Sequence, residues 1–391
     1  MQLLTILDDY PDFIANELSH RFFKHTDLEI LLSRLPLVFH RSIIGTSFEG
    51  RDLSLVQWGE GKTKVFLWSQ MHGNEATGTM ALFDLFNFLQ LEKYKELAES
   101  IGKACTLYFL PMVNPDGAER FTRRNAQQID INRDFRHLVS PEGALLKALR
   151  DQIAPDFGFN LHDQSTLWSV KKTGKPATLS YLAPAYNDAL EVNESRGKAM
   201  LVIADMYKTL NQVLPDQIGL FDDAYEVRAF GDNFQAAGTS TILIEAGGYG
   251  DDVEKQSIRK YYFLSILSAL SSISGGSYSD RTLAQYFGIP KNTKELFHIL
   301  IEDIQCLGTR MSIGLNYEEV PGPDGRSTEK CYTVQDMGDL EDLHGYQVYN
   351  GNELTVDGEI VFDKPANFSL MKGGKRIMHF INGVLQSKTI N

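Results

Sequence analysis

Short apolar runs alternate with longer amphipathic stretches over the first two thirds of the chain. The runs have the length of buried strands, and the stretches repeat apolar residues at helical spacing. Strands are predicted at residues 54–58, 64–68, 106–112, 156–161 and 241–245. Helices are predicted at residues 10–35, 80–89, 194–210 and 253–272, and from Pro141 with Ser140 as N-cap. This alternation predicts an α/β fold, with a mixed, mostly parallel central sheet of about eight strands flanked by helices.

The pattern changes after Leu307, where short alternating runs are separated by turn residues. The turns are PGPDG at 321–325, YNGN at 349–352 and VDG at 356–358. Such spacing is typical of a small all-β module. We therefore predict two domains, a catalytic domain over residues 1–290 and a C-terminal β module over residues 305–391.

The composition excludes some classes of function. The chain has 391 residues and a net charge of −13, from 38 basic and 51 acidic residues. An acidic chain is a poor partner for the phosphates of nucleic acids, so no nucleic-acid partner is expected. Its three cysteines are odd in number and far apart, which argues against a disulfide framework and against a cysteine zinc site.

The sequence has no feature of a membrane protein. The N-terminus lacks a basic segment followed by an apolar run, and no stretch of 18 apolar residues occurs. A cytoplasmic location without membrane contact is the default prediction, although a chain whose leader had been removed would look the same. The oligomeric state is not indicated.

The strongest local motif is HGNE, which follows the predicted strand at residues 64–68. It places His72 and Glu75 three residues apart, so that both can point to one side of a helix start. Imidazole nitrogen and carboxylate oxygen are both good zinc ligands. The carboxyl ends of strands are also where α/β sheets bind ligands. Alone, the motif also fits a capped helix start with a solvated glutamate.

A catalytic zinc site needs a third protein ligand and an open position for water. His162 is the best candidate, because it follows the strand predicted at residues 156–161. His137, in a polar loop, is the main rival. Zinc hydrolysis also needs a base, for which Glu245 at the end of a buried strand is the best candidate. A buried ion pair is the alternative role of Glu245.

Arginines follow in the segment between these motifs. The chain carries NPDG at 114–117, then Arg123 and Arg124, then DINR at 130–133. An arginine fork binds a carboxylate with two hydrogen bonds, and a second arginine could stabilise an oxyanion. Of Arg123 and Arg124, one is expected at the surface, and Arg123 is preferred for the site.

In this order, the motifs resemble those of the zinc metallocarboxypeptidase family of the carboxypeptidase A type. The resemblance covers roughly residues 25–270 and includes IGTSFEGR at 44–51, which is similar to an upstream stretch of the family. It implies that His72, Glu75 and His162 bind one Zn²⁺ per chain, and that Glu245 acts as general base. Cobalt or manganese would suit the same ligands.

The resemblance also implies roles for other residues. Arg123 would polarise the scissile carbonyl, and Asn132 and Arg133 would bind the terminal carboxylate of the substrate. Arg51 would contact a residue upstream of the cut. Two further substrate-binding residues are expected on weaker grounds: Tyr225, which could match a mobile tyrosine of the family, and Asp232, which would favour a basic side chain if it points inward.

The expected reaction is hydrolysis of a peptide amide bond next to a free C-terminal carboxylate. The HGNE motif and the C-terminal β module, however, resemble the succinylglutamate desuccinylase and aspartoacylase branch. A zinc-dependent deacylase acting on N-acyl amino acids is therefore the main alternative. A peptidase of cell-wall peptides and a non-catalytic carboxylate-binding module are the other two.

Overall fold

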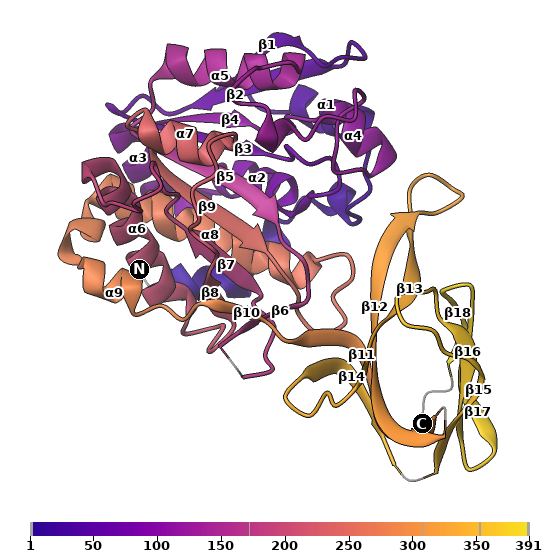
Figure 1. Ribbon diagram of the computed structural model, residues 1–391. Coiled ribbons are helices and arrows are strands. Elements are labelled where there is room, and N and C mark those ends of the chain that lie inside the picture. The colour runs from indigo at the N-terminus through magenta and orange to yellow at the C-terminus, as the bar shows by residue number, and fades with distance from the viewer. Residues whose placement is uncertain (1–2, 172, 307, 352, 389–391) are drawn as a thin grey trace. The chain divides into compact units, whose positions relative to one another are not determined.

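The computed structural model describes residues 3–171, 173–306, 308–351 and 353–388 (Figure 1). They form two compact units. The first comprises the described residues of Met1–Thr166 and Ala177–Asn292, and the second those of Leu167–Pro176 and Thr293–Asn391. A segment from the middle of the chain thus belongs to the second unit together with the C-terminal quarter.

An eight-stranded mixed sheet forms the centre of the first unit. Its order across the sheet is β1 (His40–Thr46), β2 (Asp52–Trp58), β4 (Cys105–Leu110), β3 (Thr63–Ser69), β5 (Phe157–Asp163), β9 (Ser240–Ala246), β7 (Leu179–Leu182) and β8 (Ile218–Leu220). The four central strands, β4, β3, β5 and β9, run parallel. Their carboxyl ends therefore meet at one edge, where an open α/β sheet binds its ligands.

Nine α-helices of the described residues belong to this unit. They are α1 (His25–Ser33), α2 (Thr77–Phe88), α3 (Lys95–Ala104), α4 (Pro115–Arg120), α5 (Pro141–Ile153), α6 (Glu194–Leu210), α7 (Phe230–Ala236), α8 (Gln256–Gly275) and α9 (Leu283–Phe287). The 3-10 helices are η1 (Leu3–Asp12), η2 (Asn16–Leu18), η3 (Glu92–Tyr94), η4 (Ile131–Arg133) and η5 (Ser277–Asp280). Figure 1 shows the helices on both faces of the sheet.

Each face of the sheet has its own apolar core, because side chains alternate along a strand. In β3, Val65 and Leu67 join the core under α2, α3, α6 and α8. Phe66 and Trp68 join the core under α5 and α7. Strands buried on both faces are continuous apolar runs in the sequence, which is why these strands could be predicted from it.

The α/β prediction is confirmed, and most of the predicted elements are present. The α6 helix has the predicted bounds, and Ser140 caps α5 by accepting a hydrogen bond from the backbone N–H of Gly143. The helix predicted at residues 10–35 is wrong over its first half, since only α1 is an α-helix there.

A buried ion pair accounts for this difference. The backbone N–H of Ala15 donates to Asp84, and Arg259 donates to the carbonyls of Ala15 and Leu18. Arg259 and Asp84 are themselves paired, with both side chains fully buried. The segment therefore satisfies its backbone groups through side chains distant in sequence, and helical periodicity does not report such contacts.

The second unit is all β, as predicted for residues 305–391. Its main sheet has the order β12 (Thr309–Pro321), β13 (Thr328–Gly338), β18 (Val384–Lys388), β17 (Lys375–Ile381), β16 (Asn367–Lys372), β15 (Leu354–Glu359), β11 (Leu296–Cys306) and β14 (His344–Asn350). Because β12 also pairs with β11, the sheet closes on itself around its own apolar core. A second, two-stranded sheet joins β6 (Trp168–Val170) to β10 (Asn292–Lys294).

Helices of membrane-spanning length and apolarity do not occur in the part of the chain that the structure describes.

Candidate metal centre and active site

Three of the predicted site residues lie at the carboxyl ends of adjacent parallel strands. His72 follows β3, His162 lies near the end of β5, and Glu245 lies near the end of β9. In the β5–β9 ladder, His162 and Glu245 are direct partners. Parallel strands in register project paired side chains to the same face of the sheet. The ends of these strands therefore bring together residues far apart in the sequence.

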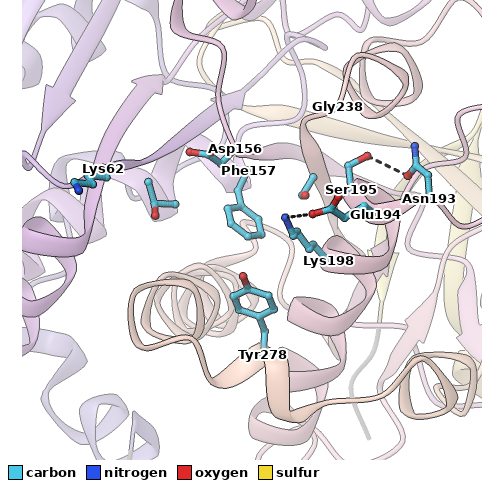
Figure 2. A pocket seen from close by; sticks show the side chains of 11 residues that line it. Lys62, Asp156, Phe157, Asn193, Glu194, Ser195, Lys198, Gly238 and Tyr278 are labelled. Atoms are coloured by element: carbon cyan, nitrogen blue, oxygen red, sulfur yellow. Dashed lines mark hydrogen bonds and ion pairs between the residues drawn. The ribbon is translucent and has the colours of Figure 1, made fainter.

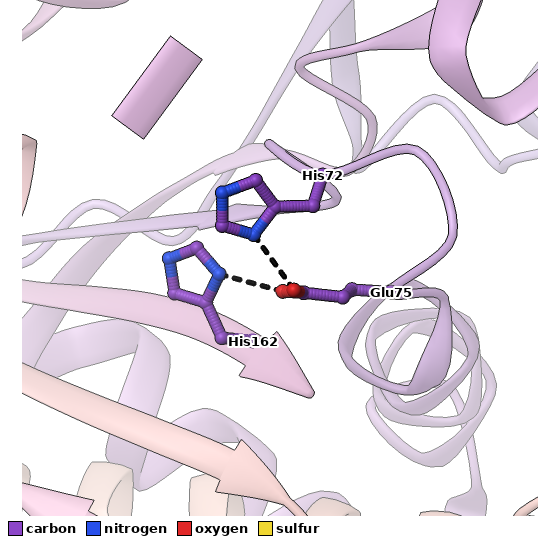
Figure 3. A group of neighbouring side chains, drawn as sticks. All are labelled: His72, Glu75 and His162. Atoms are coloured by element: carbon purple, nitrogen blue, oxygen red, sulfur yellow. Dashed lines mark hydrogen bonds and ion pairs between the residues drawn. The ribbon is translucent and has the colours of Figure 1, made fainter. Parts of the chain in front are cut away.

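His72, Glu75 and His162 form a compact cluster of possible metal ligands (Figure 3). The Nδ1 atom of His72 lies 2.7 Å from Oε1 of Glu75, and Nδ1 of His162 lies 2.8 Å from Oε2. One donor atom from each residue lies within 4.8 Å of the other two. All three side chains are buried. Two imidazoles and one carboxylate are a donor set that catalytic zinc sites use, so the residues fit this ion.

The HGNE and NPDG motifs pack against each other beside this cluster. A Cβ atom added to Gly73 would lie 2.0 Å from the carbonyl carbon of Gly117, so a larger residue cannot replace Gly73 without moving the backbone. Asn114 caps α4 through the N–H of Gly117 and donates to the carbonyls of Met71 and Arg123. The NPDG motif thus fixes the backbone on either side of the candidate ligands.

Asp130 connects the cluster to the arginine predicted for the site. Its Oδ1 atom lies 3.1 Å from Nε2 of His72, the ring nitrogen that faces away from Glu75. Its Oδ2 atom accepts a hydrogen bond of 3.0 Å from Nε of Arg123. A carboxylate on the second nitrogen of a ligating histidine fixes the tautomer and the ring orientation. The sequence marked Asp130 only as part of a motif, and its contact with His72 was missed.

The two adjacent arginines point to different places. Nη1 of Arg123 lies 3.2 Å from Oε1 of Glu75, whereas Nη1 of Arg124 donates to the backbone carbonyl of Gln128 in a loop. The side chain of Arg123 keeps 45% of its surface exposed, so it borders the cluster and still faces solvent. The structure therefore places Arg123, and not Arg124, beside the cluster.

Charges within the cluster shift its pKa values in opposite directions. Burial opposes the charge on Glu75, but the two histidines outweigh burial and hold the pKa of Glu75 well below its usual range. Burial also opposes the charge on His72, but Glu75 and Asp130 outweigh it and raise the pKa of His72. For His162, burial outweighs the hydrogen bond and the charge of Glu75, and it lowers the pKa. The carboxylate of Glu75 is thus held in its charged form between the two imidazoles.

Glu245 lies beside this cluster as a buried carboxyl group with an unsatisfied acceptor. Only 8% of its surface is exposed, and its Oε2 atom has no hydrogen-bond partner among the described residues. Burial, together with the charges of Glu75 and Asp163, raises the pKa of Glu245 well above its usual range. A buried acceptor without a partner is costly, and its presence is typical of a functional group.

Of the two predicted carboxylate-binding residues, Asn132 contacts the cluster and Arg133 pairs with a carboxylate. Nδ2 of Asn132 lies 3.5 Å from Nε2 of His162, and its Oδ1 accepts from the N–H of Phe230. Arg133 is 38% exposed, and its Nε forms an ion pair of 3.3 Å with Oε2 of Glu226. A carboxylate therefore already lies beside the guanidinium of Arg133.

Tyr225 and Asp232 lie close to this ion pair. Tyr225 is half-buried in the loop before α7, where burial and the charge of Asp232 raise its pKa. The Oδ1 atom of Asp232 accepts from the backbone N–H of Glu226, and burial raises the pKa of Asp232 to about 6. The side chain of Asp232 thus holds the loop that carries Tyr225.

Arg51 and His137 are not part of the cluster. Nη1 of Arg51 forms ion pairs with Asp116 at 2.7 Å and with Glu49 at 2.6 Å, and the Asp116 side chain is fully buried. Arg51 thus has two carboxylate partners in the described structure, and its contact with substrate stays a prediction. His137 is exposed in the loop before α5.

A separate cavity of about 640 Å³ lies at the opposite ends of the same strands (Figure 2). Thr63, Phe157 and Ser240, the first residues of β3, β5 and β9, line it. Two of its charged residues, Lys198 and Glu194, are paired with each other at 2.7 Å. The cavity contains none of the predicted site residues, and its walls offer no cluster of metal ligands among the described residues.

Comparison with known proteins agrees with this geometry. Residues 26–192 match the family model described as zinc carboxypeptidase. Carboxypeptidase Z of Gallus gallus is 28% identical over 167 residues, which cover 35% of this chain and 25% of that protein. Carboxypeptidase SOL1 of Arabidopsis thaliana is 29% identical over 131 residues, covering 30% of this chain and 26% of that protein. The chain thus spans only about a quarter of the length of these relatives.

Solved structures give the same fold. A metallo-carboxypeptidase from Burkholderia cenocepacia aligns with a TM-score of 0.54 at 16% identity, covering 66% of this chain and 70% of that one. One from Pseudomonas aeruginosa, in complex with (2-guanidinoethylmercapto)succinic acid, aligns with a TM-score of 0.53 at 17% identity, covering 64% and 68%. The likeness to the desuccinylase and aspartoacylase branch stays a prediction. The predicted resemblance to the zinc metallocarboxypeptidases is confirmed, since residues 26–192 of the chain are similar to that family.

Proposed function

We propose that this protein is a zinc-dependent metallocarboxypeptidase that hydrolyses the peptide bond next to a free C-terminal carboxylate. The observation that carries the proposal is the position of Glu245. Its buried, unsatisfied carboxyl group is the ladder partner of His162, one of three converged metal-ligand candidates. A metal-ligand triad beside an unused carboxylate is the arrangement that metal-assisted hydrolysis requires.

In this proposal, His72, Glu75 and His162 hold one zinc ion per chain. When bound, zinc lowers the pKa of a water molecule to about 7 and so supplies a nucleophile at neutral pH. Asp130 holds the ring of His72 through Nε2, which leaves Nδ1 for the metal.

Glu245 acts as the proton carrier. Its carboxylate takes the proton of the attacking water and then gives it to the nitrogen of the leaving amino acid. Efficient proton transfer requires a pKa close to the working pH, and burial raises the pKa of Glu245 in that direction. The side chain needs no rearrangement of hydrogen bonds, since Oε2 has no partner to give up.

Two arginines bind the negatively charged groups of the substrate. Arg123, which borders the cluster and is partly exposed, is placed to donate to the oxygen of the scissile carbonyl as negative charge develops there. Arg133 and Asn132 bind the terminal carboxylate, which joins or replaces Glu226 beside the Arg133 guanidinium. By orienting the substrate, Arg133 and Asn132 contribute to the rate of hydrolysis.

The test is a hydrolysis assay on matched substrates. The purified protein, with zinc and with chelator, is given peptides with a free C-terminus, the same peptides amidated at the C-terminus, and N-acyl amino acids. We expect zinc-dependent release of one residue from the free peptides and no cleavage of the amidated ones. Cleavage of N-acyl amino acids alone would contradict the proposal and indicate a deacylase instead.

A further inference from the structure

Lys255 is a buried cation that no predicted role accounts for. Only 4% of the residue is exposed. Its Nζ atom forms an ion pair of 3.1 Å with Oδ2 of Asp163 and donates to the backbone carbonyl of Ala246 at 2.9 Å. Asp163 directly follows His162, and Ala246 directly follows Glu245. One ammonium group thus joins the ends of β5 and β9.

The same network also reaches α2, the helix that begins two residues after Glu75. Oδ2 of Asp163 also accepts a hydrogen bond of 2.7 Å from the hydroxyl of Thr77, the first residue of α2, two positions after Glu75. The network of Lys255, Asp163 and Thr77 therefore reaches the backbone within two residues of Glu75, His162 and Glu245.

The local structure around Lys255 contradicts the ordinary preferences of a helix start. Lys255 is the N-cap residue of α8 and has φ of 51°, a left-handed conformation that is costly for a residue with a side chain. An N-cap favours serine, threonine, aspartate or asparagine, and a positive charge is unfavourable at the positive end of the helix dipole. Asp252 caps the helix instead, by accepting from the N–H groups of Ser257 and Ile258.

A residue that breaks several local rules at once is expected to be retained for function. We propose that Lys255 is a positioning residue of the active site, which fixes the carboxyl ends of β5 and β9 and thereby the placement of Glu245 relative to His162 and Glu75. The inference rests on the proposed function. Loss of the ammonium would let the two strand ends move apart while the side chains that touch the substrate stay intact.

The test uses the double variant Lys255→Met, Asp163→Asn. The single change Lys255→Met would leave the charge of Asp163 buried without its cation, which destabilises proteins for reasons unrelated to function. The double variant removes both charges and still lacks the donor to Ala246. We expect it to fold, with Zn²⁺ affinity weaker by about 10- to 100-fold, as for other groups that support metal ligands. We also expect a lower kcat with a nearly unchanged KM.

The matched control is Lys260→Met, the same substitution on the same helix. Lys260 lies over the ring of Tyr261, with Nζ 5.1 Å from the ring centroid, and has no ion pair in the described structure. It should leave Zn²⁺ affinity, kcat and the absorption spectrum of the Co²⁺-loaded protein unchanged. The Co²⁺ spectrum of the double variant should differ from that of the wild type, because it reports the ligand geometry.

Unchanged Zn²⁺ affinity, Co²⁺ spectrum and kcat in the double variant would overturn the inference. If that variant does not fold, Thr77→Val removes only the hydroxyl contact with Asp163 and is expected to weaken Zn²⁺ binding in the same direction; no weakening would also overturn it. Absence of peptidase activity in the wild type would instead contradict the proposed function, and Zn²⁺ affinity and the Co²⁺ spectrum would still decide the role of Lys255.

Discussion

His162 and Glu245 are direct partners across the parallel strands β5 and β9. Register along this ladder fixes the distance between a candidate metal ligand and the candidate base, because both belong to the same regular sheet. A slip of one residue in β9 would turn Glu245 to the other face, against the core that holds Leu161 and Ile244. The chemistry proposed here therefore depends on the packing that sets the register of β9.

Glu245→Gln tests the role of the base. The amide has nearly the same shape but cannot take a proton, so we expect kcat to fall by about 10²- to 10⁴-fold with Zn²⁺ affinity unchanged. Steady-state kinetics and a metal-binding titration measure the two quantities. Activity close to that of the wild type would remove Glu245 from the mechanism.

Asp130→Asn tests the support of His72. The asparagine keeps an oxygen near Nε2 but loses the charge that holds the ring tautomer. We expect Zn²⁺ affinity to fall by about 10- to 100-fold, as for similar second contacts of metal ligands. Competition with a chelator measures the affinity. Asp134→Asn, in a neighbouring carboxylate that instead accepts from the N–H groups of Val139 and Ser140, serves as control and should retain the affinity.

Arg133→Ala tests the carboxylate clamp. Hydrogen bonds to a charged group contribute about 1.5–3 kcal/mol, so kcat/KM for peptides with a free C-terminus should fall by about 10- to 150-fold. Arg228→Ala is the matched control, since Arg228 pairs with the same Glu226 at 2.7 Å. Equal losses in the two variants would indicate that Glu226, and not the substrate, is the partner that matters.

Asp232→Asn is expected to stabilise the first unit at neutral pH. The folded state raises the pKa of Asp232 from 3.8 to about 6, so it binds this proton more tightly than the unfolded state. Stability therefore falls as pH rises from about 4 to about 6, by at most about 3 kcal/mol. Asparagine keeps the acceptor for the N–H of Glu226. Thermal unfolding should give equal stabilities near pH 3 and a more stable variant at pH 7.

His298 makes the second unit sensitive to acid. Burial and the charge of Lys330 lower its pKa to about 3, so the unfolded state takes up this proton first as the pH falls. Stability is thus lost below the unfolded pKa near 6.5, by about 2 kcal/mol at pH 5. His298→Phe keeps a ring against Tyr317 and should reduce this loss. Hydrogen exchange of the β unit at pH 7 and pH 5 measures it, and an equal loss in both proteins would contradict the assignment.

The sequence was sufficient for residues whose position follows from a strand end. His72 and His162 each follow an apolar run that reads as a buried strand, and Glu245 closes another. Adjacent parallel strands then bring their carboxyl ends together, so the cluster could be predicted without knowing the strand order.

Residues placed by long-range contacts could not be found in this way. Lys255 meets Asp163 across 92 positions, and the sequence places it only in the first turn of the helix predicted at residues 253–272. Arg51 matched a family stretch, but only the structure shows that the buried Asp116 binds its guanidinium. Asp232 was predicted from its interval to Glu245, whereas its contact with the backbone of Glu226 depends on how the loop before α7 folds.

The segment Leu167–Pro176 belongs to the second unit, although the residues on both sides of it in the sequence belong to the first. This arrangement has a consequence for protein engineering. The chain passes between the two units three times, after Thr166, after Pro176 and after Asn292. A single cut near residue 292 would leave the β unit without β6, the partner strand of β10. Exchange of the C-terminal unit between related proteins would therefore need a matched graft of the internal segment.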